Sequence, residues 1–313
     1  MNPVVLNPET LSPEDVVAVA RHHARVELDA ETLGRVAESR RAVESLAGRE
    51  RPVYGVSTGF GALAQRHIPH SLRAQLQKSL VRSHAAGIGE PVEPEVVRAL
   101  MLLRARTLAT GRTGVRPEVL STYVDILNAG ITPLVPEYGS LGCSGDLAPL
   151  AACALVAMGE GEVLDSEGNP APAAEALTEA GIAPVELAEK EGLALINGTD
   201  GMLGMLVLAL HDLENLLTTA DISAAMSVEA LHGTDRVFLP ELFEPLRPHP
   251  GQTLSAANTL SALEDSAIVA SHRDSTHLVQ DAYSLRCAPQ RIGVLHEVGG
   301  VAVGGDDRRV LQG

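Results

Sequence analysis

Apolar residues recur at intervals of three and four positions along most of the chain, the spacing that is typical of amphipathic α-helices. The first such stretch follows Ser12, a suitable N-cap, and Pro13, which fits the first helical position. A second stretch follows Asp29 and stops at Gly48. The pattern therefore predicts two surface helices near the start of the chain.

Three further periodic segments each end on a glycine, the residue that most readily adopts the left-handed conformation of a helix C-cap. They are residues 71–87, 93–111 and 116–130. Residues 199–232 predict one long helix of about 30 residues, roughly 45 to 50 Å at 1.5 Å per residue. Because charged residues interrupt its apolar part from His211 onward, we interpret it as a buried bundle helix and not a membrane span.

Extended structure is expected in few places. Residues 161–173, "GEVLDSEGNPAPA", predict a small surface turn or hairpin between helical blocks. The chain shows no internal repeat and no low-complexity linker. The predicted fold class is therefore mainly α, in one domain.

Composition and charge narrow the possible partners. The 313 residues are 45% hydrophobic, which is ample for a buried core. A formal charge of −16 argues against nucleic acid or an anionic membrane surface as the main partner, because both would repel the chain. Small molecules and other proteins remain as partners.

The cysteines and the N-terminus indicate in which cellular compartment the chain is located. Cys143, Cys153 and Cys287 are odd in number and widely spaced, which fits neither a disulfide framework nor a zinc ribbon. The first residues lack the basic start and apolar stretch of an export signal. We therefore expect a reducing, cytoplasmic location.

Familiar catalytic motifs are weak or absent. Gly59, Gly61 and Ala64 match a dinucleotide fingerprint, but a βαβ unit is not evident, so a glycine loop is the better interpretation. Pro69 separates His67 from His70, which disfavours a helical metal site. The sequence "GCSGD" around residue 144 is not the G-x-S-x-G elbow of a serine hydrolase.

The stretch "EYGSLGCSGDLAPLA", residues 137–151, offers a different chemistry. In a sharply bent chain, the amide nitrogen of Gly145 can attack the carbonyl carbon of Cys143. Loss of water there and from Ser144 would then leave an exocyclic methylidene, a carbon electrophile of a kind that ordinary side chains lack. Glycine at 145 removes a Cβ that would block the approach, while Asp146 and Pro149 would start a helix that holds the bend. Taken alone, the stretch is more typical of a capped loop.

Five motifs in order make the sequence similar to a known family. They are "YGVSTGFG", "SLVRSHAAGIGEP", "GSLGCSGDLAPLA", "KEGLALINGTDG" and "VQDAYSLRCAPQ". On these motifs the chain resembles the aromatic amino acid lyase family from near its start to about Gln290. The resemblance implies an elongated helical bundle of the ammonia-lyase type over residues 1–290. Residues 291–313 read as a divergent glycine-rich tail, where the long C-terminal helices of the family would follow.

The resemblance also implies a prosthetic group and no external cofactor. In this family an internal tripeptide, usually Ala-Ser-Gly, cyclises autocatalytically to methylidene-imidazolone (MIO), and it corresponds here to Cys143, Ser144 and Gly145. Cysteine at the first position is a departure, but only its main chain enters the ring. No metal is implied.

Further residues take roles by the same resemblance. Tyr54 resembles the base that removes the substrate β-proton, although tyrosine hydroxyls are ordinarily protonated at pH 7. Tyr283 joins the catalytic group near the ring. The substrate-binding residues would be His84, Asn197, Gln280 and Arg286, of which His84 would face the substrate ring and Arg286 would hold the carboxylate.

The implied reaction is the non-oxidative deamination of L-histidine to urocanate and ammonia. The pair Ser83–His84 accompanies histidine substrates in the family, whereas phenylalanine and tyrosine lyases carry a more apolar pair. Attack by the substrate amine or by its ring remains open. So do three alternatives: a phenylalanine or tyrosine ammonia-lyase, an aminomutase, and a catalytically deficient fragment. Relatives are homotetramers, so we expect a homo-oligomer.

Overall fold

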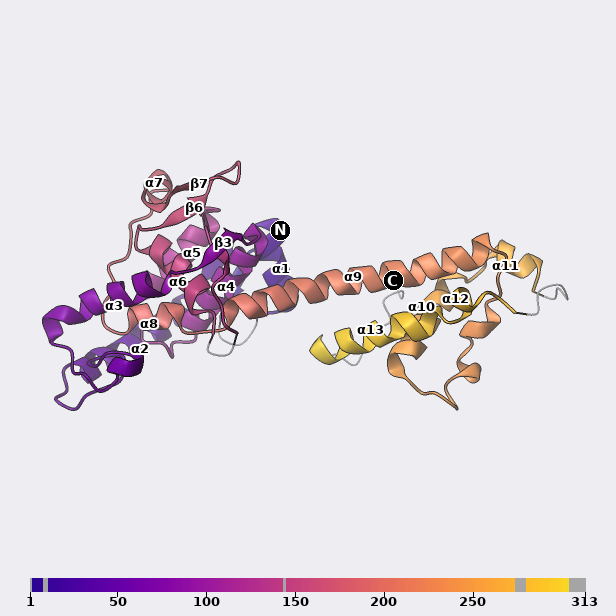
Figure 1. The fold of residues 1–313 in the computed structure, drawn as a ribbon, viewed down its shortest axis with the longest axis horizontal. Helices are drawn as coiled ribbons and strands as arrows, with labels where there is room; N and C mark the ends of the chain where they lie inside the picture. The colour runs from indigo at the N-terminus through magenta and orange to yellow at the C-terminus, as the bar shows by residue number, and fades with distance from the viewer. Residues whose placement is uncertain (1, 8–10, 143–144, 274–279, 304–313) are drawn as a thin grey trace. The chain divides into compact units, whose positions relative to one another are not determined.

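The computed structural model describes residues 2–7, 11–142, 145–273 and 280–303, with side chains through residue 297. It is mainly helical and separates into two compact units, residues 1–208 and residues 209–313. The boundary falls within helix α9 (Asp200–Ala230), so each unit contains part of that helix (Figure 1). The mainly α prediction is confirmed. From the sequence we expected a boundary near residue 290, between the lyase-like domain and the tail. The contacts within the chain separate the two units after residue 208.

Unit 1 contains the five helices predicted from the apolar spacing, α1 to α5, and three further helices, α6 to α8. Their bounds are α1 Pro13–His22, α2 Ala30–Ala47, α3 His70–His84, α4 Pro94–Ala109, α5 Pro117–Asn128, α6 Leu147–Ala157, α7 Ala173–Glu179 and α8 Glu191–Ile196, with the 3₁₀ turn η1 at Gly61–Leu63. The predicted N-cap Ser12 is confirmed, and Asp29, the predicted start of the next helix, is the N-cap of α2. Ser12 accepts from the amide of Asp15, whose carboxylate accepts from the Ser12 amide, and Asp29 accepts from the Thr32 amide.

The glycine C-caps are confirmed in two of three cases. Gly111 and Gly130, with φ of 68° and 74°, follow the ends of α4 and α5 in the left-handed conformation. Helix α3 instead ends at His84, before Gly87, which has no positive φ. A Cβ on Gly87 would lie 3.2 Å from the Pro136 ring, so this glycine allows two chain segments to approach closely.

Short strands connect the helices of unit 1. β1 (Val4–Leu6) pairs with β2 (Val26–Leu28) in parallel, and β3 (Ile88–Pro91) pairs with β5 (Pro136–Tyr138) in antiparallel. The third sheet has the order β4 (Thr132–Pro133), β6 (Glu162–Leu164), β7 (Pro170–Pro172). The β6–β7 pair confirms the predicted hairpin; in its turn the Asp165 carboxylate accepts from the amides of Glu167 and Asn169.

Helix α4 lies at the centre of unit 1. Every residue from 96 to 105 is buried, and the helix packs against α1, α2 and α5. Its two buried arginines both donate to main-chain carbonyls: Arg98 bonds Val19 and Leu127, and Arg104 bonds Ala194 and Asn197. Burial lowers the pKa of Arg98. These bonds tie helices that are distant in sequence to one central element.

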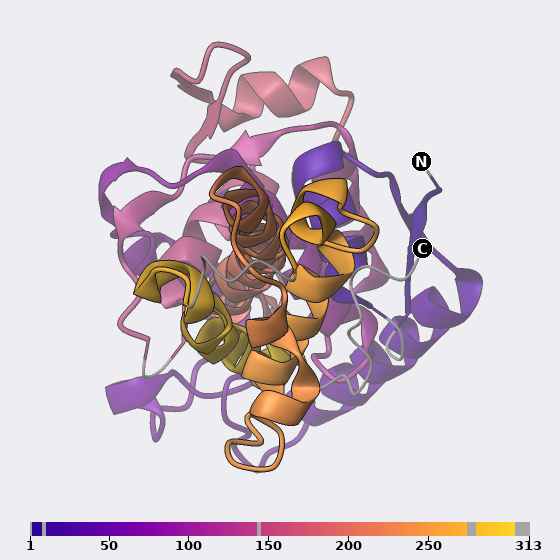
Figure 2. The same ribbon diagram turned by 90° about the vertical axis from the view of Figure 1, so that its right-hand side faces the viewer.

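Unit 2 is built on the second half of α9. Its other elements are the 3₁₀ turns η2 Arg236–Phe238 and η3 Pro240–Leu242 and the helices α10 Pro250–Ala262, α11 Ala267–Ser271, α12 Tyr283–Arg286 and α13 Ala288–Val303. Helices α10 and α13 lie side by side (Figure 2). The closest approach is at Gly251 and Gly293, where a Cβ on Gly293 would lie 2.5 Å from the Gln252 amide nitrogen. Buried Asp221 of α9 links both helices by accepting from Ser255 and Asn258 of α10 and bonding His296 of α13.

Residues 291–303, which the sequence assigned to a glycine-rich tail, thus lie in helix α13. The apolar spacing in this segment is too weak to predict a helix. Gly293 allows α13 to pack closely against α10 and contributes nothing to an apolar stripe. Residues 304–313 lie outside the described part of the chain.

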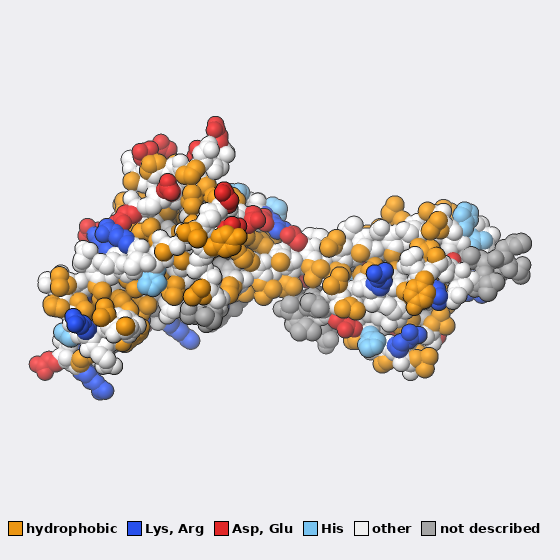
Figure 3. All heavy atoms as spheres, in the orientation of Figure 1, with side chains coloured by type: hydrophobic (Ala, Val, Ile, Leu, Met, Phe, Trp, Pro, Cys, Tyr) orange, Lys and Arg blue, Asp and Glu red, His pale blue; other side chains and the backbone are white. Residues whose placement is uncertain are grey.

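Helix α9, 31 residues long, confirms the predicted long helix. Within the described residues, 191–230 is long and apolar enough by length and composition to cross a membrane, but core helices of soluble proteins pass the same test. Leu208 packs into the core of unit 1, and Ala225 and Val228 pack into that of unit 2. We therefore interpret α9 as a core helix. Its other faces still expose large apolar side chains, including Leu216 and Met226, and Figure 3 shows many hydrophobic side chains at the surface.

Candidate active site

A cavity of about 490 Å³ in unit 1 brings together four residues that the sequence singled out. They are Tyr54, Ser83, His84 and Asn197. Between them the wall is mostly apolar, formed by Phe60, Leu63, Leu76, Leu80, Leu147, Leu193 and Ile196. Sequence reasoning missed these apolar residues, since nothing in their spacing separates a pocket wall from a core. A few polar groups in an apolar cavity are typical of a small-molecule site.

Tyr54 stands on a tight turn between α2 and η1. The amides of Val56 and Ser57 both donate to the Val53 carbonyl, and the buried Ser57 hydroxyl accepts from the Val53 amide. Gly55 has a φ of 74°, and a Cβ there would lie 2.9 Å from Leu193. The tyrosine ring meets Phe60 edge-on at 6.2 Å between centroids. The turn thus presents a half-exposed Tyr54 to the cavity on a fixed backbone.

The last turn of α3 supplies Ser83 and His84. The Ser83 hydroxyl donates to the Leu80 carbonyl at 2.9 Å, and His84 Nδ1 lies 2.9 Å from the same carbonyl. A carbonyl only accepts, so this arrangement places a proton on Nδ1. In the neutral ring Nε2 is then free to accept a hydrogen bond from a ligand.

The glycine-rich loop is described on both sides of Cys143 and Ser144, which themselves lie outside the described residues. Gly145 has a φ of 104°, and a Cβ there would lie 2.5 Å from the Gly198 carbonyl oxygen. The next amide, that of Asp146, donates to this same oxygen at 2.7 Å. Position 145 therefore requires glycine for both conformation and space.

Asp146 holds the loop as predicted, but not as a helix cap. It precedes α6, yet its side chain accepts no bond from that helix. Its carboxylate instead accepts from the Ser140 hydroxyl at 2.7 Å and from the Met202 amide of α9 at 2.9 Å. The buried carboxylate thus ties the loop to the first turn of α9, a contact that the local sequence does not reveal.

Asn197 ends α8 beside this loop. Its backbone amide donates to the Leu193 carbonyl. The next residue, Gly198, has the carbonyl oxygen that accepts from the Asp146 amide. Leu147, which follows Asp146, lines the same cavity as Asn197. The bend at Gly145 therefore lies beside the cavity wall.

Gln280, Tyr283 and Arg286 belong to unit 2. Tyr283 and Arg286 lie on the single turn of α12, where the Arg286 guanidinium carbon is 4.6 Å from the centroid of the exposed Tyr283 ring. Their roles at the site stay predictions, as do those of Tyr54, His84 and Asn197. Among the described residues, no three His, Cys, Asp or Glu side chains form a metal site.

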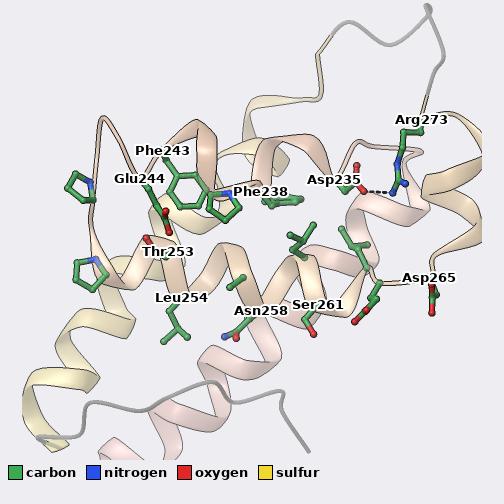
Figure 4. Close-up of a pocket in the computed structure, with 17 residues that line it drawn as sticks. Asp235, Phe238, Phe243, Glu244, Thr253, Leu254, Asn258, Ser261, Asp265 and Arg273 are labelled. Carbon is green, nitrogen blue, oxygen red and sulfur yellow. Dashed lines mark hydrogen bonds and ion pairs between the residues drawn. The ribbon is translucent and has the colours of Figure 1, made fainter.

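Unit 2 has a second cavity of about 1150 Å³, lined mainly by η2, η3 and α10 (Figure 4). Phe238 and Phe243 face it together with several prolines and leucines, and Arg273 at one end pairs with Asp235. It contains none of the site residues predicted from the sequence. It is larger than the cavity in unit 1, and its lining includes polar and charged side chains such as Glu244, Asn258 and Arg273.

The comparisons with known proteins agree with this geometry. The family model "Aromatic amino acid lyase" matches residues 11–301. The chain is 63% identical over 290 residues to histidine ammonia-lyase of Streptomyces griseus, covering 93% of this chain and 56% of the relative, and 61% identical over 293 residues to that of Streptomyces avermitilis, covering 94% and 57%.

Solved structures agree as well. Tyrosine aminomutase from Streptomyces globisporus matches with a TM-score of 0.87 and 38% identity over 96% of this chain and 60% of that one. Histidine ammonia-lyase from Trypanosoma cruzi matches with a TM-score of 0.84 and 36% identity over 96% and 55%. The chain thus spans little more than half the length of these relatives.

Proposed function

Because the chain belongs to the aromatic amino acid lyase family, we propose that it provides the histidine-binding part of an ammonia-lyase that converts L-histidine to urocanate and ammonia. The observation that carries the proposal is the cavity in which Tyr54, His84 and Asn197 meet, beside the bend at Gly145. The high identity to histidine ammonia-lyases supports the choice of reaction.

The prosthetic group of the proposal is MIO, formed from Cys143, Ser144 and Gly145 without an external cofactor. Gly145, the described residue of this tripeptide, fits the group, because it is bent at a φ of 104° in a space that excludes a Cβ. The bonds of Asp146 to Gly198, Ser140 and Met202 would hold the ring in place. The ring supplies a carbon electrophile, which side chains of proteins do not offer.

The chain's own residues bind the substrate and move its proton. In the reaction the Cβ–H and Cα–N bonds break, a Cα=Cβ double bond forms, and no electrons are gained or lost overall. Tyr54 Oη is the proposed acceptor of the β-proton, which requires its ionised form. His84 Nε2 would accept a hydrogen bond from the imidazole of the substrate and so orient it. Arg286 would pair with the carboxylate, while Gln280 and Tyr283 would complete the polar surroundings.

The polar pair Ser83–His84 favours histidine over phenylalanine or tyrosine. These are the polar side chains at the end of α3 in a wall that is otherwise mainly apolar. An apolar ring would leave His84 Nε2 without a partner on burial, which costs free energy. The likeness to tyrosine aminomutase supports the second candidate, an enzyme acting on tyrosine.

We further propose that the chain associates with other copies and works in the cytoplasm. Exposed apolar side chains on α9, among them Leu206, Leu216 and Met226, support association, because such faces are usually covered by a partner. Cys153 and Cys287 are free, which is compatible with a reducing compartment.

Mass spectrometry of the peptide that contains Ser144 tests the proposal. We expect the parental peptide to be lighter by two waters and Ser144→Ala to lack this loss at unchanged helical content. Turnover assays with histidine, tyrosine and phenylalanine then compare the candidates, and we expect urocanate to be the main product. An intact, unmodified Ser144 peptide in the folded parent would refute the prosthetic group.

A further inference from the structure

Arg104 lies on the central helix α4, and its side chain reaches the corner between α8 and α9. Its side chain is 1% exposed and forms an ion pair with Asp200, the first residue of α9. Nη1 also donates to the carbonyl of Ala194 at 3.1 Å and to that of Asn197 at 3.3 Å. Thr107, one turn further along α4, donates to the other Asp200 oxygen at 3.3 Å. One guanidinium thus fixes the end of α8 and the start of α9.

The ion pair packs directly against the Gly198 backbone. A Cβ on Gly198 would overlap the Arg104 guanidinium and the Asp200 carboxylate. Gly198 has no positive φ, so glycine is required here by space and not by conformation. The position of this peptide is therefore set by Arg104 and Asp200.

Gly198 also contacts the glycine-rich loop. Its carbonyl oxygen accepts from the Asp146 amide at 2.7 Å and leaves no room for a Cβ on Gly145. The contacts therefore run without a gap from Arg104, through Gly198, to the residue that ends the tripeptide. A shift of the Gly198 peptide would move the partner that the bend at Gly145 rests on.

We propose that Arg104, through its ion pair with Asp200, is a positioning residue that fixes the Gly198 carbonyl and thereby the bend at Gly145 from which the ring forms. The inference rests on the proposed function, since the bend matters for catalysis only if the ring forms. Arg104 does not itself line the cavity. It acts through Gly198 and Asn197.

Arginine suits this position better than lysine. Its planar fork bonds two carbonyls and a carboxylate at once, in fixed directions, whereas an ammonium is a single point charge on a flexible stem. Arg104→Lys would keep the charge and lose this geometry. Asp200→Asn would keep the shape and remove the charge of the partner.

Helix α4 offers a matched control in Arg98. It is also buried, lies six positions earlier on the same helix and donates to the carbonyls of Val19 and Leu127. Neither carbonyl belongs to the corner at Gly198. Arg98→Lys therefore disturbs the same helix by the same chemistry without touching the loop.

Hydrogen exchange of the Asp146 amide is the measurement, because this amide donates to the Gly198 carbonyl. We expect exchange to rise about tenfold or more in Arg104→Lys and in Asp200→Asn, and to stay at the parental rate in Arg98→Lys. In the same preparations the fraction of chains with the two-water mass loss should fall in the first two variants alone. Urea unfolding of each variant reports the global loss of stability.

The outcomes separate this inference from the proposed function. If the Asp146 amide exchanges at the parental rate in Asp200→Asn and in folded Arg104→Lys, the positioning role of Arg104 is overturned. The same holds if the exchange rate rises equally in Arg98→Lys. If Arg104→Lys does not fold, Asp200→Asn decides. A parental chain without the mass loss refutes the proposed function, while faster Asp146 exchange in the variants would still establish that Arg104 fixes the bend.

Discussion

Removing the Asp146 carboxylate should strongly destabilise unit 1. The carboxylate is 1% exposed and accepts from the Ser140 hydroxyl at 2.7 Å and the Met202 amide at 2.9 Å. Hydrogen bonds to a charged group each contribute about 1.5–3 kcal/mol, and Asp146→Ala leaves the amide of partly buried Met202 and the hydroxyl of exposed Ser140 without this acceptor. We therefore expect a loss of about 3–5 kcal/mol in the free energy of unfolding. This corresponds to a drop in Tm on the order of 10 °C.

Asp146→Asn provides a graded comparison. Its amide oxygen can accept from Met202 and its NH₂ can donate to Ser140 Oγ, so both contacts survive without the charge. We expect a loss of about 1–2 kcal/mol. Asp165 is the matched control, because its carboxylate also accepts two hydrogen bonds, from the amides of Glu167 and Asn169 at 2.8 Å, but in the exposed β6–β7 turn. Asp165→Ala should change stability much less.

Urea unfolding followed by circular dichroism measures these differences, and the mass of the Ser144 peptide reports the ring in the same samples. We expect the ring fraction to follow the order parent, Asp146→Asn, Asp146→Ala. Equal urea midpoints for Asp146→Ala and Asp165→Ala would refute the reasoning, since the buried contacts would then contribute no more than the exposed ones.

Three further predictions concern other parts of the chain. Burial raises the pKa of the Cys153 thiol to about 12, so at pH 8 about one thiol in ten thousand is ionised. We therefore expect peptide mapping to show that a thiol reagent leaves Cys153 unmodified in the native state. The Thr32 amide lowers the pKa of Asp29, so this cap stabilises the fold above about pH 4, and its contribution is lost as pH falls through the lowered pKa. In Asp29→Ser, the free energy of unfolding measured in urea should therefore fall less between pH 5 and pH 2. His84→Leu should lower histidine turnover by about tenfold or more and raise the relative rate on tyrosine, measured as kcat/KM for both substrates, and an unchanged ratio would contradict the role of His84.

Local patterns predicted the elements that local forces determine. The caps at Ser12 and Asp29 and the β6–β7 hairpin depend on residues within a few positions of one another, so their sequence signals are complete. Helix α9 followed from its length and apolar content. Gly87 misled because a glycine required for close approach to Pro136 looks the same in sequence as a glycine that ends a helix.

The geometry of the candidate site depends on contacts between distant segments. The Asp146 amide meets the Gly198 carbonyl across about fifty residues of sequence, and Arg104 reaches Asp200 across 96 residues. No periodicity encodes such pairs. The resemblance to a family pointed to Tyr54, His84 and Asn197, whereas no motif or spacing singled out Arg104 or Asp200. Only the fold shows that both are buried.

The lining of the unit 1 cavity also explains why the proposed site needs a cation from elsewhere. An amino-acid substrate carries a carboxylate, and a buried carboxylate is costly unless it is paired. Among the described residues that line the cavity, none is lysine or arginine, and His84 is already engaged with the Leu80 carbonyl through Nδ1. The cavity can therefore orient a ring and accept a proton, but it cannot neutralise the carboxylate with its own side chains. This requirement gives a physical reason for the predicted role of Arg286, whose permanent charge and planar fork match a carboxylate. It follows that Arg286→Met should raise the KM for histidine far more than it alters ring formation at Ser144.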